Sequence, residues 1–580
     1  MSSAVDIGDP ANGDHTMRSN SFKTSSTAHG GGLRGADVGR RSSLYEGRFG
    51  RMFRELPPAS HDAAALIALG NAMTAAPEVM NGLPAAAPET PDHLQDDEEN
   101  AGIAAGYTYF GQFIDHDITF DPASSLMQQN DPDALTDFRT PRLDLDSLYG
   151  RGPAEQPYMY RGDKLRVGRP LTENGKPSHS RDVPRFVDSE DPTAPRRALI
   201  GDKRNDENVI VSQLQSTFLQ LHNRLSDDPR LGDKPRFEEV QRIVRWHYQY
   251  VVVNDFLVRI CGEDIVNDIL PHRLHDAPAW QKKPKFNFFH WRNGPFMPIE
   301  FSTAAYRFGH SMVRPIYRLN TELNGGDNPA QATPAEVDRG LAGRFFVFAG
   351  VQNRGLNGFG EFPKEWAIDW SLFFDINGSG TAGGIRRAQP AYKIDTSLVN
   401  PLGFLPEFST TVAASGPLTV AQMQGVPVDP VNDPANLAAR NLLRGRAMNL
   451  PSGQSVARAM GLPPIPDEEL WVGKAIVGEL DKSPTLVDID ARFAGNAPLW
   501  YYVLAEAQHY WLKKATGPHG KGDAQPLHLG PVGGRIVAET LIGLIAADGH
   551  SYLSQDPNWE PLIGGRHTTV GKLIEYALQL

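Results

Sequence analysis

The sequence predicts a mainly α-helical fold, built as one large domain with long loops and little β-structure. Apolar residues recur at helical spacing, as at Ile103, Tyr107, Phe110 and Ile114, which are 4, 3 and 4 positions apart and share one helix face. Strand-like alternation of apolar and polar residues is scarce and short. No repeat occurs at the period of a solenoid, which argues against a stacked repeat architecture.

Helical segments follow one another from about residue 98 to the C-terminus without a clean break. The expected helices cover 103–114, 208–224, 237–261, 299–314, 435–448, 498–514 and 531–547. The expected long loops are 120–200, 262–298, 320–345 and 376–434. On size alone, 580 residues would allow three or four domains of about 150 residues each. We instead expect a disordered tail at 1–43, which is rich in Ser, Gly and Arg, and one domain at 44–580.

Composition and charge argue against several classes of protein. There are 57 Lys and Arg against 69 Asp and Glu, a net charge of −12, so we expect no nucleic-acid partner. Cys261 is the only cysteine, which excludes an internal disulfide and a thiolate cluster, whereas 17 His remain for metal chemistry. No secretory apolar core and no run of about 18 apolar residues occur. We therefore expect no membrane span, and a cytoplasmic location or export without a classical signal peptide.

Residues 111–122, GQFIDHDITFDP, form the first segment with a chemical pattern. Gln112 and His116 are four positions apart, so they share a helix face. Asp115 and Asp117 flank His116 and lie about 200° apart around a helix axis, so they point in nearly opposite directions. Taken alone, the pattern is also typical of a solvated acidic helix end.

Residues 140–150, TPRLDLDSLYG, form an oxygen-rich loop. Its alternating positions are Thr140, Arg142, Asp144 and Asp146, which would put oxygen atoms on one side of an extended chain. Calcium prefers six to eight oxygen ligands, so the loop is a candidate Ca²⁺ site, with a plain polar turn as the alternative. It is not an EF-hand, because Tyr149 stands where that motif requires Gly.

Three further segments carry polar groups that each have an ordinary explanation when taken alone, as helix caps or packed core residues. They are Arg204 and Glu207 in GDKRNDEN (201–208), His310 in EFSTAAYRFGHSMVRP (300–315), and Asn441 and Arg444 in LAARNLLRGR (437–446). Together, the order and character of the five segments resemble the animal haem peroxidase family over roughly residues 45–560. FGRMF (49–53) and GGRIVAETLIGLI (533–545) are similar to that family's terminal stretches.

The resemblance implies a haem peroxidase domain of the animal type that reduces hydrogen peroxide and oxidises a small-molecule electron donor or a halide. Its cofactors would be haem b and Ca²⁺. The implied catalytic residues are His116 as distal acid–base, Gln112 as its neighbour, and Arg204 as stabiliser of the departing oxygen. The implied haem-binding residues are His310 as iron ligand, Asn441 as acceptor of its N–H, and Arg444. The implied Ca²⁺ ligands are Asp117, Thr140, Arg142 through its carbonyl, Asp144 and Asp146, where the family commonly has Ser.

These residue types suit the chemistry. An imidazole with a pKa near 6.5 can take a proton from one peroxide oxygen and return it to the other, while a guanidinium stabilises the developing negative charge. Asp115 and Glu207 stand where vertebrate relatives form ester bonds to haem, so we expect such a link through one or both. Asn208 replaces the Met that the strongest chloride oxidiser bonds to haem. We therefore expect bromide, iodide or thiocyanate, rather than chloride, as an inorganic electron donor.

Two alternatives stay open at this point. The oxygenase branch, which includes fatty-acid dioxygenases, carries a radical-forming Tyr three residues before the proximal His; here that residue is Arg307, and Tyr306 lies four before. Residues 447–449 also depart from the usual Asp-His-Gly of the family. A non-catalytic haem- and Ca²⁺-binding module is the second alternative. A zinc hydrolase is not supported, because no H-E-x-x-H motif occurs.

Overall fold

We describe the protein from a computed structural model. The structure describes residues 47–75, 99–120, 136–173, 176–191, 193–194, 196–273, 283–292, 294–320, 344–346, 355–381, 387–405, 408–410, 426–427, 433–475, 483–516 and 527–580. The tail expected at 1–43 lies outside these residues, as do parts of the expected loops.

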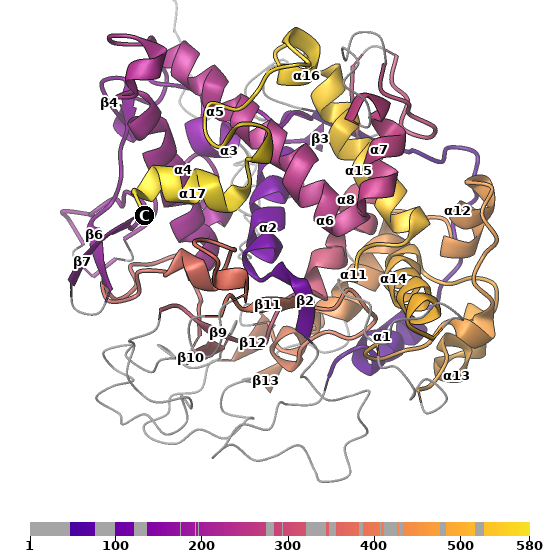
Figure 1. Cartoon of the computed structure of the whole chain (residues 1–580). Coiled ribbons are helices and arrows are strands. Elements are labelled where there is room, and N and C mark those ends of the chain that lie inside the picture. Colours follow the sequence, from indigo (N-terminus) through magenta and orange to yellow (C-terminus); the bar gives the residue numbers. More distant parts are fainter. Residues whose placement is uncertain are drawn as a thin grey trace, which may run out of the picture.

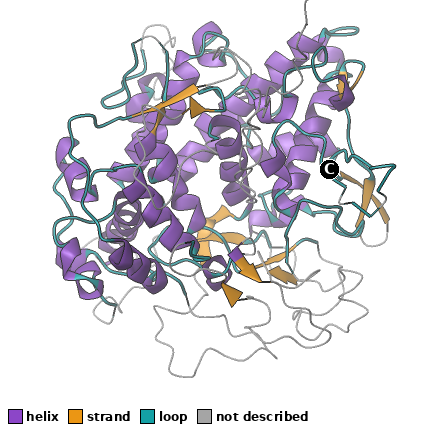
Figure 2. Ribbon diagram, turned by 180° about the vertical axis from the view of Figure 1, so that it is seen from behind, coloured by secondary structure: helices purple, strands orange, loops and turns teal. Residues whose placement is uncertain are grey.

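Helices are the main secondary structure of the described chain, and its strands are short, which confirms the predicted mainly α fold (Figure 2). The α-helices are α1 (Ala63–Ala72), α2 (Gly106–Ile118), α3 (Asp146–Tyr149), α4 (Val209–Leu225), α5 (Phe237–Val251), α6 (Leu257–Cys261), α7 (Glu263–Ile269), α8 (Ile299–Thr303), α11 (Leu437–Ala447), α12 (Gly453–Ala459), α13 (Leu486–Ile489), α14 (Leu499–Thr516), α15 (Pro531–Ala547), α16 (Tyr552–Gln555) and α17 (Val570–Leu578).

The strands belong to one three-stranded sheet and five pairs. They are β1 (Gly47–Gly50), β2 (Glu99–Ala104), β3 (Thr136–Asp137), β4 (Tyr160–Arg161), β5 (Lys164–Leu165), β6 (Pro170–Glu173), β7 (Lys176–Arg181), β8 (Met297–Pro298), β9 (Ile316–Arg318), β10 (Arg344–Phe346), β11 (Pro390–Tyr392), β12 (Ser409–Thr410) and β13 (Val426–Pro427). Among these strands, β1 and β8 pair in parallel and the remaining pairs are antiparallel.

Helix α2 lies near the centre of the helical body (Figure 1). Its Phe110 and Phe113 stack on Phe218 of α4, with ring centroids 6.4 and 4.9 Å apart. Both rings also meet Tyr248 of α5 edge-on. These aromatic contacts bury large apolar surface in preferred geometries, so they hold α2 rigidly between its neighbours. The start of α2 is equally tight, because a Cβ at Gly106 would clash with the Phe373 carbonyl oxygen.

The predicted helix at 237–261 is one continuous helical segment whose middle turn is not α-helical. Helices α5 and α6 are joined by a π-helical turn, Val252–Phe256. The extra residue in such a turn redirects the side chains that follow it. Here it carries the buried Asp255, which accepts hydrogen bonds from Tyr107 on α2, Arg259 on α6 and the backbone N–H of Val570 on α17. One carboxylate thus joins three helices.

Two predicted helices have different boundaries in the structure. The segment 299–314 is not one α-helix: α8 ends at Thr303, Ala304 leaves helical geometry (φ −127°, ψ −76°), and a 3₁₀ turn, Ala305–His310, follows. Ile103 belongs to strand β2, so the first helical face begins only in α2. Each error follows from apolar spacing that continues across a backbone break, which periodicity does not detect.

One contiguous apolar core runs from α1 to α17 and includes residues of every long helix, as expected for a single large domain. The prediction of a single domain beginning at residue 44 remains a prediction. Among the described residues, no helix combines the length and the apolar character that a membrane crossing requires.

Candidate active site

The last turns of α2 bring the predicted distal residues together with the segment before α4. Gln112 donates a hydrogen bond to Glu207 and accepts one from Asn208 at 3.1 Å. His116 is buried, and its Nε2 lies 3.9 Å from a Glu207 carboxylate oxygen. The helix spacing that the sequence shows therefore produces a shared polar face, and Gln112, His116 and Glu207 form one cluster.

His116 has a partner that the sequence analysis missed. Its Nδ1 lies 2.8 Å from the side-chain oxygen of Asn205, whose amide nitrogen donates to Gln215 Oε1 at 2.9 Å. Because the amide orientation of Asn205 is set by Gln215, the oxygen faces His116 and the His116 Nδ1 donates its proton. This assigns the proton to Nδ1 and the lone pair to Nε2, which is the form a general base needs.

Arg204 is buried beside this cluster and is held by several acceptors. Its Nη2 donates to the carbonyl oxygens of His116 and Thr119 at 3.0 and 2.6 Å, and its Nε and Nη2 contact Asp202. Although burial alone would raise it, the guanidinium groups of Arg139 and Arg204 hold the pKa of Asp202 well below its usual range. Asp202 therefore stays ionised and fixes Arg204 at the C-terminal end of α2, where the carbonyl groups favour a cation.

The predicted proximal residues also meet. His310 ends the 3₁₀ turn, and its Nδ1 lies 2.7 Å from the amide nitrogen of Asn441 on α11. Arg307 donates to the Asn441 side-chain oxygen at 3.2 Å, and its own carbonyl accepts from Trp500 of α14 at 3.1 Å. Arg444 follows Asn441 by three positions on α11 and is half-buried.

The direction of the His310–Asn441 bond differs from the expected one. Arg307 can only donate, so the Asn441 oxygen faces Arg307 and its NH₂ faces His310. An imidazole that binds iron through Nε2 must instead donate its Nδ1–H, which requires the amide oxygen on its side. A 180° turn of the Asn441 amide would produce that arrangement, but it would break the hydrogen bond from Arg307, whose donor would then face the amide NH₂.

The distal and proximal segments are tied to each other. Tyr306 donates to the Gly111 carbonyl of α2 at 3.1 Å, which joins the His310 turn to the distal helix.

Asp115 is half-buried, and burial raises its pKa although Arg204 and Arg307 oppose the shift. Its carboxylate accepts a hydrogen bond from Thr119 at 2.8 Å. A Cβ at Gly309, beside His310, would meet no atom within 4 Å. The residues therefore fit a flat group against the His310 turn.

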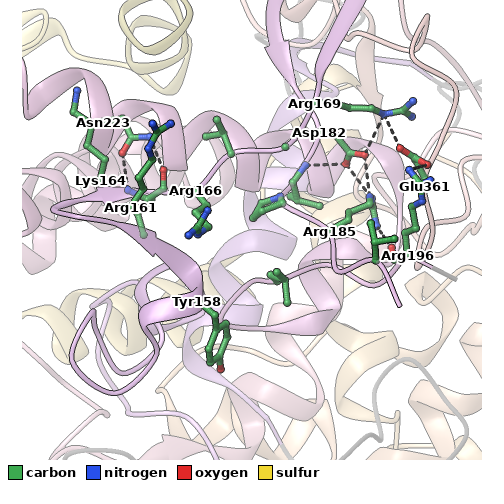
Figure 3. A pocket seen from close by; sticks show the side chains of 17 residues that line it. Tyr158, Arg161, Lys164, Arg166, Arg169, Asp182, Arg185, Arg196, Asn223 and Glu361 are labelled. Carbon is green, nitrogen blue, oxygen red and sulfur yellow. Dashed lines mark hydrogen bonds and ion pairs between the residues drawn. The ribbon is translucent and has the colours of Figure 1, made fainter. Parts of the chain in front are cut away.

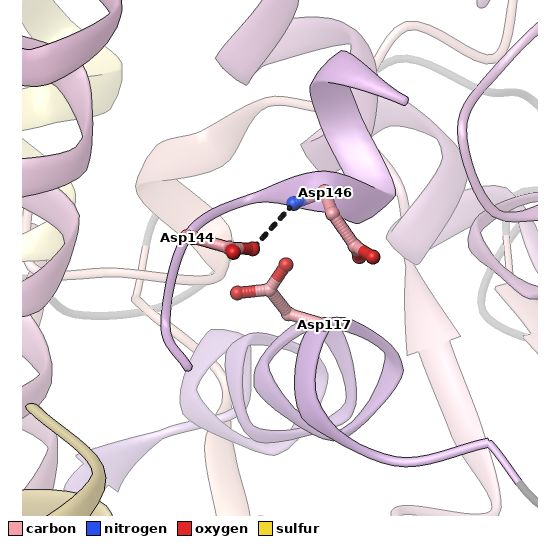
Figure 4. Close-up of side chains that lie close together, drawn as sticks. All are labelled: Asp117, Asp144 and Asp146. Carbon is pink, nitrogen blue, oxygen red and sulfur yellow. Dashed lines mark hydrogen bonds between the residues drawn. The ribbon is translucent and has the colours of Figure 1, made fainter. Parts of the chain in front are cut away.

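Three carboxylates form the predicted cation site (Figure 4). One oxygen from each of Asp117, Asp144 and Asp146 lies within 4.8 Å of the others. Burial and the negative charges of Asp144 and Asp146 raise the pKa of Asp117 well above its usual range, and burial and Asp146 raise the pKa of Asp144 to about 6. Such mutual repulsion of buried carboxylates is relieved by a bound cation.

The loop geometry supplies further oxygen atoms. The Thr140 hydroxyl donates to Asp144 at 2.9 Å, and the N–H of Arg142 bonds to the Thr140 carbonyl at 2.8 Å. Leu145 has a left-handed backbone, with φ 56°, which turns the chain so that Asp144 and Asp146 face the same centre. Arg139 pairs with Asp146 at 3.0 Å and offsets part of the negative charge.

The cation site is linked to the distal His. Ser147, which follows Asp146, donates through its hydroxyl to Asp117 at 3.2 Å. The carbonyl of Ser147 accepts from Gln215, the residue that orients Asn205. A continuous set of hydrogen bonds therefore runs from the carboxylate cluster to the His116 ring. No sequence motif signals this, because Gln215 lies within the ordinary-looking face of α4.

The chain is similar to known proteins over parts of its length. Residues 124–338 match the family model described as animal haem peroxidase. The chain is 25% identical to the human protein described as probable oxidoreductase PXDNL over 198 residues (32% of this chain, 12% of that protein). It is 24% identical to human thyroid peroxidase over 221 residues (35% and 22%), and 25% identical to mouse myeloperoxidase over 304 residues (41% and 40%). The matches thus span less than half of each relative.

Solved structures with the same fold include peroxidase A from Dictyostelium discoideum. The likeness has a TM-score of 0.50 at 14% identity and covers 95% of this chain and 96% of that one. At this identity the likeness shows the fold alone. An Arabidopsis thaliana fatty acid alpha-dioxygenase is also similar, with a TM-score of 0.47 at 13% identity, and covers 90% of this chain and 74% of that one.

Proposed function

We propose that the chain is a haem-dependent peroxidase of the animal haem peroxidase family, whose model residues 124–338 match. The proposed substrates are hydrogen peroxide and a small organic donor, bromide, iodide or thiocyanate. The observation that carries the proposal is that two imidazoles, His116 and His310, are each oriented through Nδ1 by an asparagine. For His116 the asparagine fixes the tautomer that a proton-transferring base requires, and His310 would meet the requirement of an iron ligand once the Asn441 amide turns.

The residues that would hold haem are His310, with Asn441 behind it and Arg444 one turn further on α11. Bound haem would supply the two-electron reduction of peroxide. His116 would accept the peroxide proton at Nε2 and return it to the departing oxygen, because Asn205 keeps its other nitrogen protonated. Arg204 would stabilise the negative charge: its Nε and Nη2 are occupied, so its Nη1 is the nitrogen that a ligand would meet.

Two finer proposals concern the cofactors. Asp115 and Glu207 line the distal side, and we expect an ester bond between haem and one or both. Extraction with acidified butanone tests this, because freely released haem b would contradict it. We also propose that Asp117, Thr140, Arg142, Asp144 and Asp146 bind Ca²⁺, supported by the mutual proximity of the three carboxylates.

The test begins with the protein purified in the presence of haem. We expect a Soret band that changes on addition of hydrogen peroxide, and peroxide-dependent oxidation of guaiacol, bromide and iodide with little chloride oxidation. An unsaturated fatty acid serves as the contrasting donor. Oxygen uptake with the fatty acid in the absence of peroxide turnover would overturn the proposal in favour of an oxygenase. A Soret band without any turnover would indicate a binding module.

A further inference from the structure

A surface cavity of about 810 Å³ lies outside the distal cluster and plays no part in the reaction described above (Figure 3). It is formed by the chain around β4 and β5, the segment 182–187 and side chains from 196–199, α4 and Glu361. Its volume is within the range of sites that bind small organic molecules. Its floor includes Arg185, whose guanidinium bonds to Asp206 through two nitrogens at 2.8 Å. Asp206 lies directly between Asn205 and Glu207 in the chain.

The cavity is strongly cationic although the chain carries a net charge of −12. Its cationic lining residues are Arg161, Lys164, Arg166, Arg169, Arg185 and Arg196, and its only acidic ones are Asp182 and Glu361. Several of these cations already form ion pairs. Lys164 pairs with Asp227, Arg169 and Arg196 pair with Glu361, and Arg185 pairs with Asp182 and Asp206.

Arg161 and Arg166 differ from the other cations of the cavity. Both are exposed, and within the described parts of the chain neither makes an ion pair or a side-chain hydrogen bond. Figure 3 shows them together at one end of the cavity, near Lys164 and Asn223, whereas the paired cluster of Arg169, Asp182 and Glu361 occupies the other end. An anion would therefore find available guanidinium donors at one end only.

Apolar surface adjoins these cations. Tyr158 and Val187 line the cavity and are 53% and 56% exposed, and Phe186 beside Val187 is 54% exposed. These are three of the five large apolar side chains that are exposed among the described residues. The Tyr158 hydroxyl accepts a hydrogen bond from Gln156 at 2.9 Å, which orients the ring. Clustered exposed aromatic surface beside cations is typical of a ligand site rather than of ordinary protein surface.

We propose that this cavity binds a small aromatic carboxylate, with the carboxylate on Arg161 and Arg166 and the ring against Tyr158 and Val187. The bound aromatic carboxylate would be the electron donor of the peroxidase, held on the outer side of the segment that carries Asn205 and Glu207. This role of the ligand rests on the proposed function. Its binding chemistry stands without that role, because it depends only on the charges and apolar surface of the cavity.

The test measures binding of 4-hydroxybenzoate and of the neutral 4-hydroxybenzyl alcohol by calorimetry, using the haem-loaded full chain without peroxide. We expect the anion to bind at least tenfold more tightly than the alcohol. Affinity for the anion should fall from about 0.01 M to about 1 M NaCl, because the Debye length shortens from about 30 to about 3 Å. Arg161→Glu and Arg166→Glu should each weaken anion binding by about five- to tenfold. Tyr158→Ala should weaken binding of both probes.

The matched control is Arg458→Glu, which reverses one exposed charge at the end of α12, away from the cavity. Equal affinity for the two probes, or equal effects of Arg166→Glu and Arg458→Glu, would overturn the proposal. Binding at the haem would perturb the Soret band and would not depend on Arg161 or Arg166. If selective binding is found but peroxide oxidises no donor, the cavity assignment holds and the proposed function fails. If turnover is normal and the arginine variants bind the anion with unchanged affinity, the cavity assignment fails and the proposed function stands.

Discussion

The distal and proximal imidazoles are oriented by the same type of side chain but in opposite senses. Asn205 presents its oxygen to His116, and Gln215 prevents it from turning. Asn441 presents its nitrogen to His310, because Arg307 takes its oxygen. The distal tautomer is therefore set by the protein alone, whereas the proximal one would need the amide of Asn441 to turn if His310 is an iron ligand. The difference shows that the residue beyond each asparagine decides which amide group faces the imidazole.

Replacing either imidazole tests this comparison with the largest expected effects. We expect His310→Ala to abolish the Soret band, since the proposed iron ligand would be lost. His116→Ala should retain the Soret band but lower the rate of reaction with hydrogen peroxide by about 10²–10⁴-fold, as expected for a general acid–base. Stopped-flow absorbance measures both, and His290→Ala, at an exposed site, is the control. Equal haem loss in both single-site variants would remove the distinction between the two sides.

Calcium removal should affect the distal side before the proximal side. Chelation would leave Asp117, Asp144 and Asp146 repelling one another in a buried loop that is bonded through Ser147 and Gln215 toward His116. We expect lower thermal stability, by about 4 kcal/mol for a site at 1,000 times its dissociation constant, and loss of peroxide reactivity.

Asp144→Asn should reproduce this loss in part, whereas Glu468→Gln, at an exposed acidic site, should not. Differential scanning calorimetry with and without chelator measures the effect. A chelated protein that keeps its melting temperature and its activity would refute the calcium assignment.

Asn205 provides a sharper test of the distal tautomer. Asn205→Leu removes the acceptor for His116 Nδ1–H, so we expect peroxide reactivity to fall about 10- to 100-fold with the haem spectrum kept. Asn205→Asp keeps an acceptor oxygen and should restore most of the rate. Measuring kcat and KM for peroxide in both variants separates positioning from folding. Similar losses in Asn205→Leu and Asn205→Asp would show that the hydrogen bond does not position His116.

The smallest expected effect is a dependence of folding stability on pH, which originates on the proximal side. Glu506 of α14 is buried against the N–H groups of Val532 and Gly533 at the start of α15. Burial raises its pKa from 4.5 to about 8, so the folded protein binds a proton that the unfolded chain releases. This stabilisation is fully present below pH 4.5 and is lost as the pH rises through about 8.

We therefore expect the melting temperature to fall by several degrees over this range, and Glu506→Gln to flatten the dependence. Because Trp500 on the same helix supports Arg307, the proximal side should loosen first, which hydrogen exchange of the two segments would reveal. A profile in Glu506→Gln as steep as in the parent protein would exclude Glu506 as the cause.

The sequence predicted the long helices well. Residues 531–547 were expected to be helical and form α15, Pro531–Ala547, and 208–224 became Val209–Leu225. Both begin at a local signal: Asn208 caps α4 through its side chain, and α15 begins with Pro531. The helix expected at 299–314 failed because its break at Ala304 leaves the apolar spacing intact. The most important misassignment of structure was therefore in the segment that carries His310.

For the candidate site, the resemblance of five segments to the animal haem peroxidase family nominated His116, Gln112, Arg204, Glu207, His310 and Asn441, and the carboxylates of the loop at 140–150, whereas residue types and spacing alone left ordinary explanations open. What only the tertiary structure decided was how these groups are oriented: Asn205 and Gln215 behind His116, and Arg307 behind Asn441. The physical reason is that periodicity and motif spacing act within a few turns of chain. A proton's position and an amide's orientation depend instead on hydrogen-bond partners that only the fold brings within 3 Å.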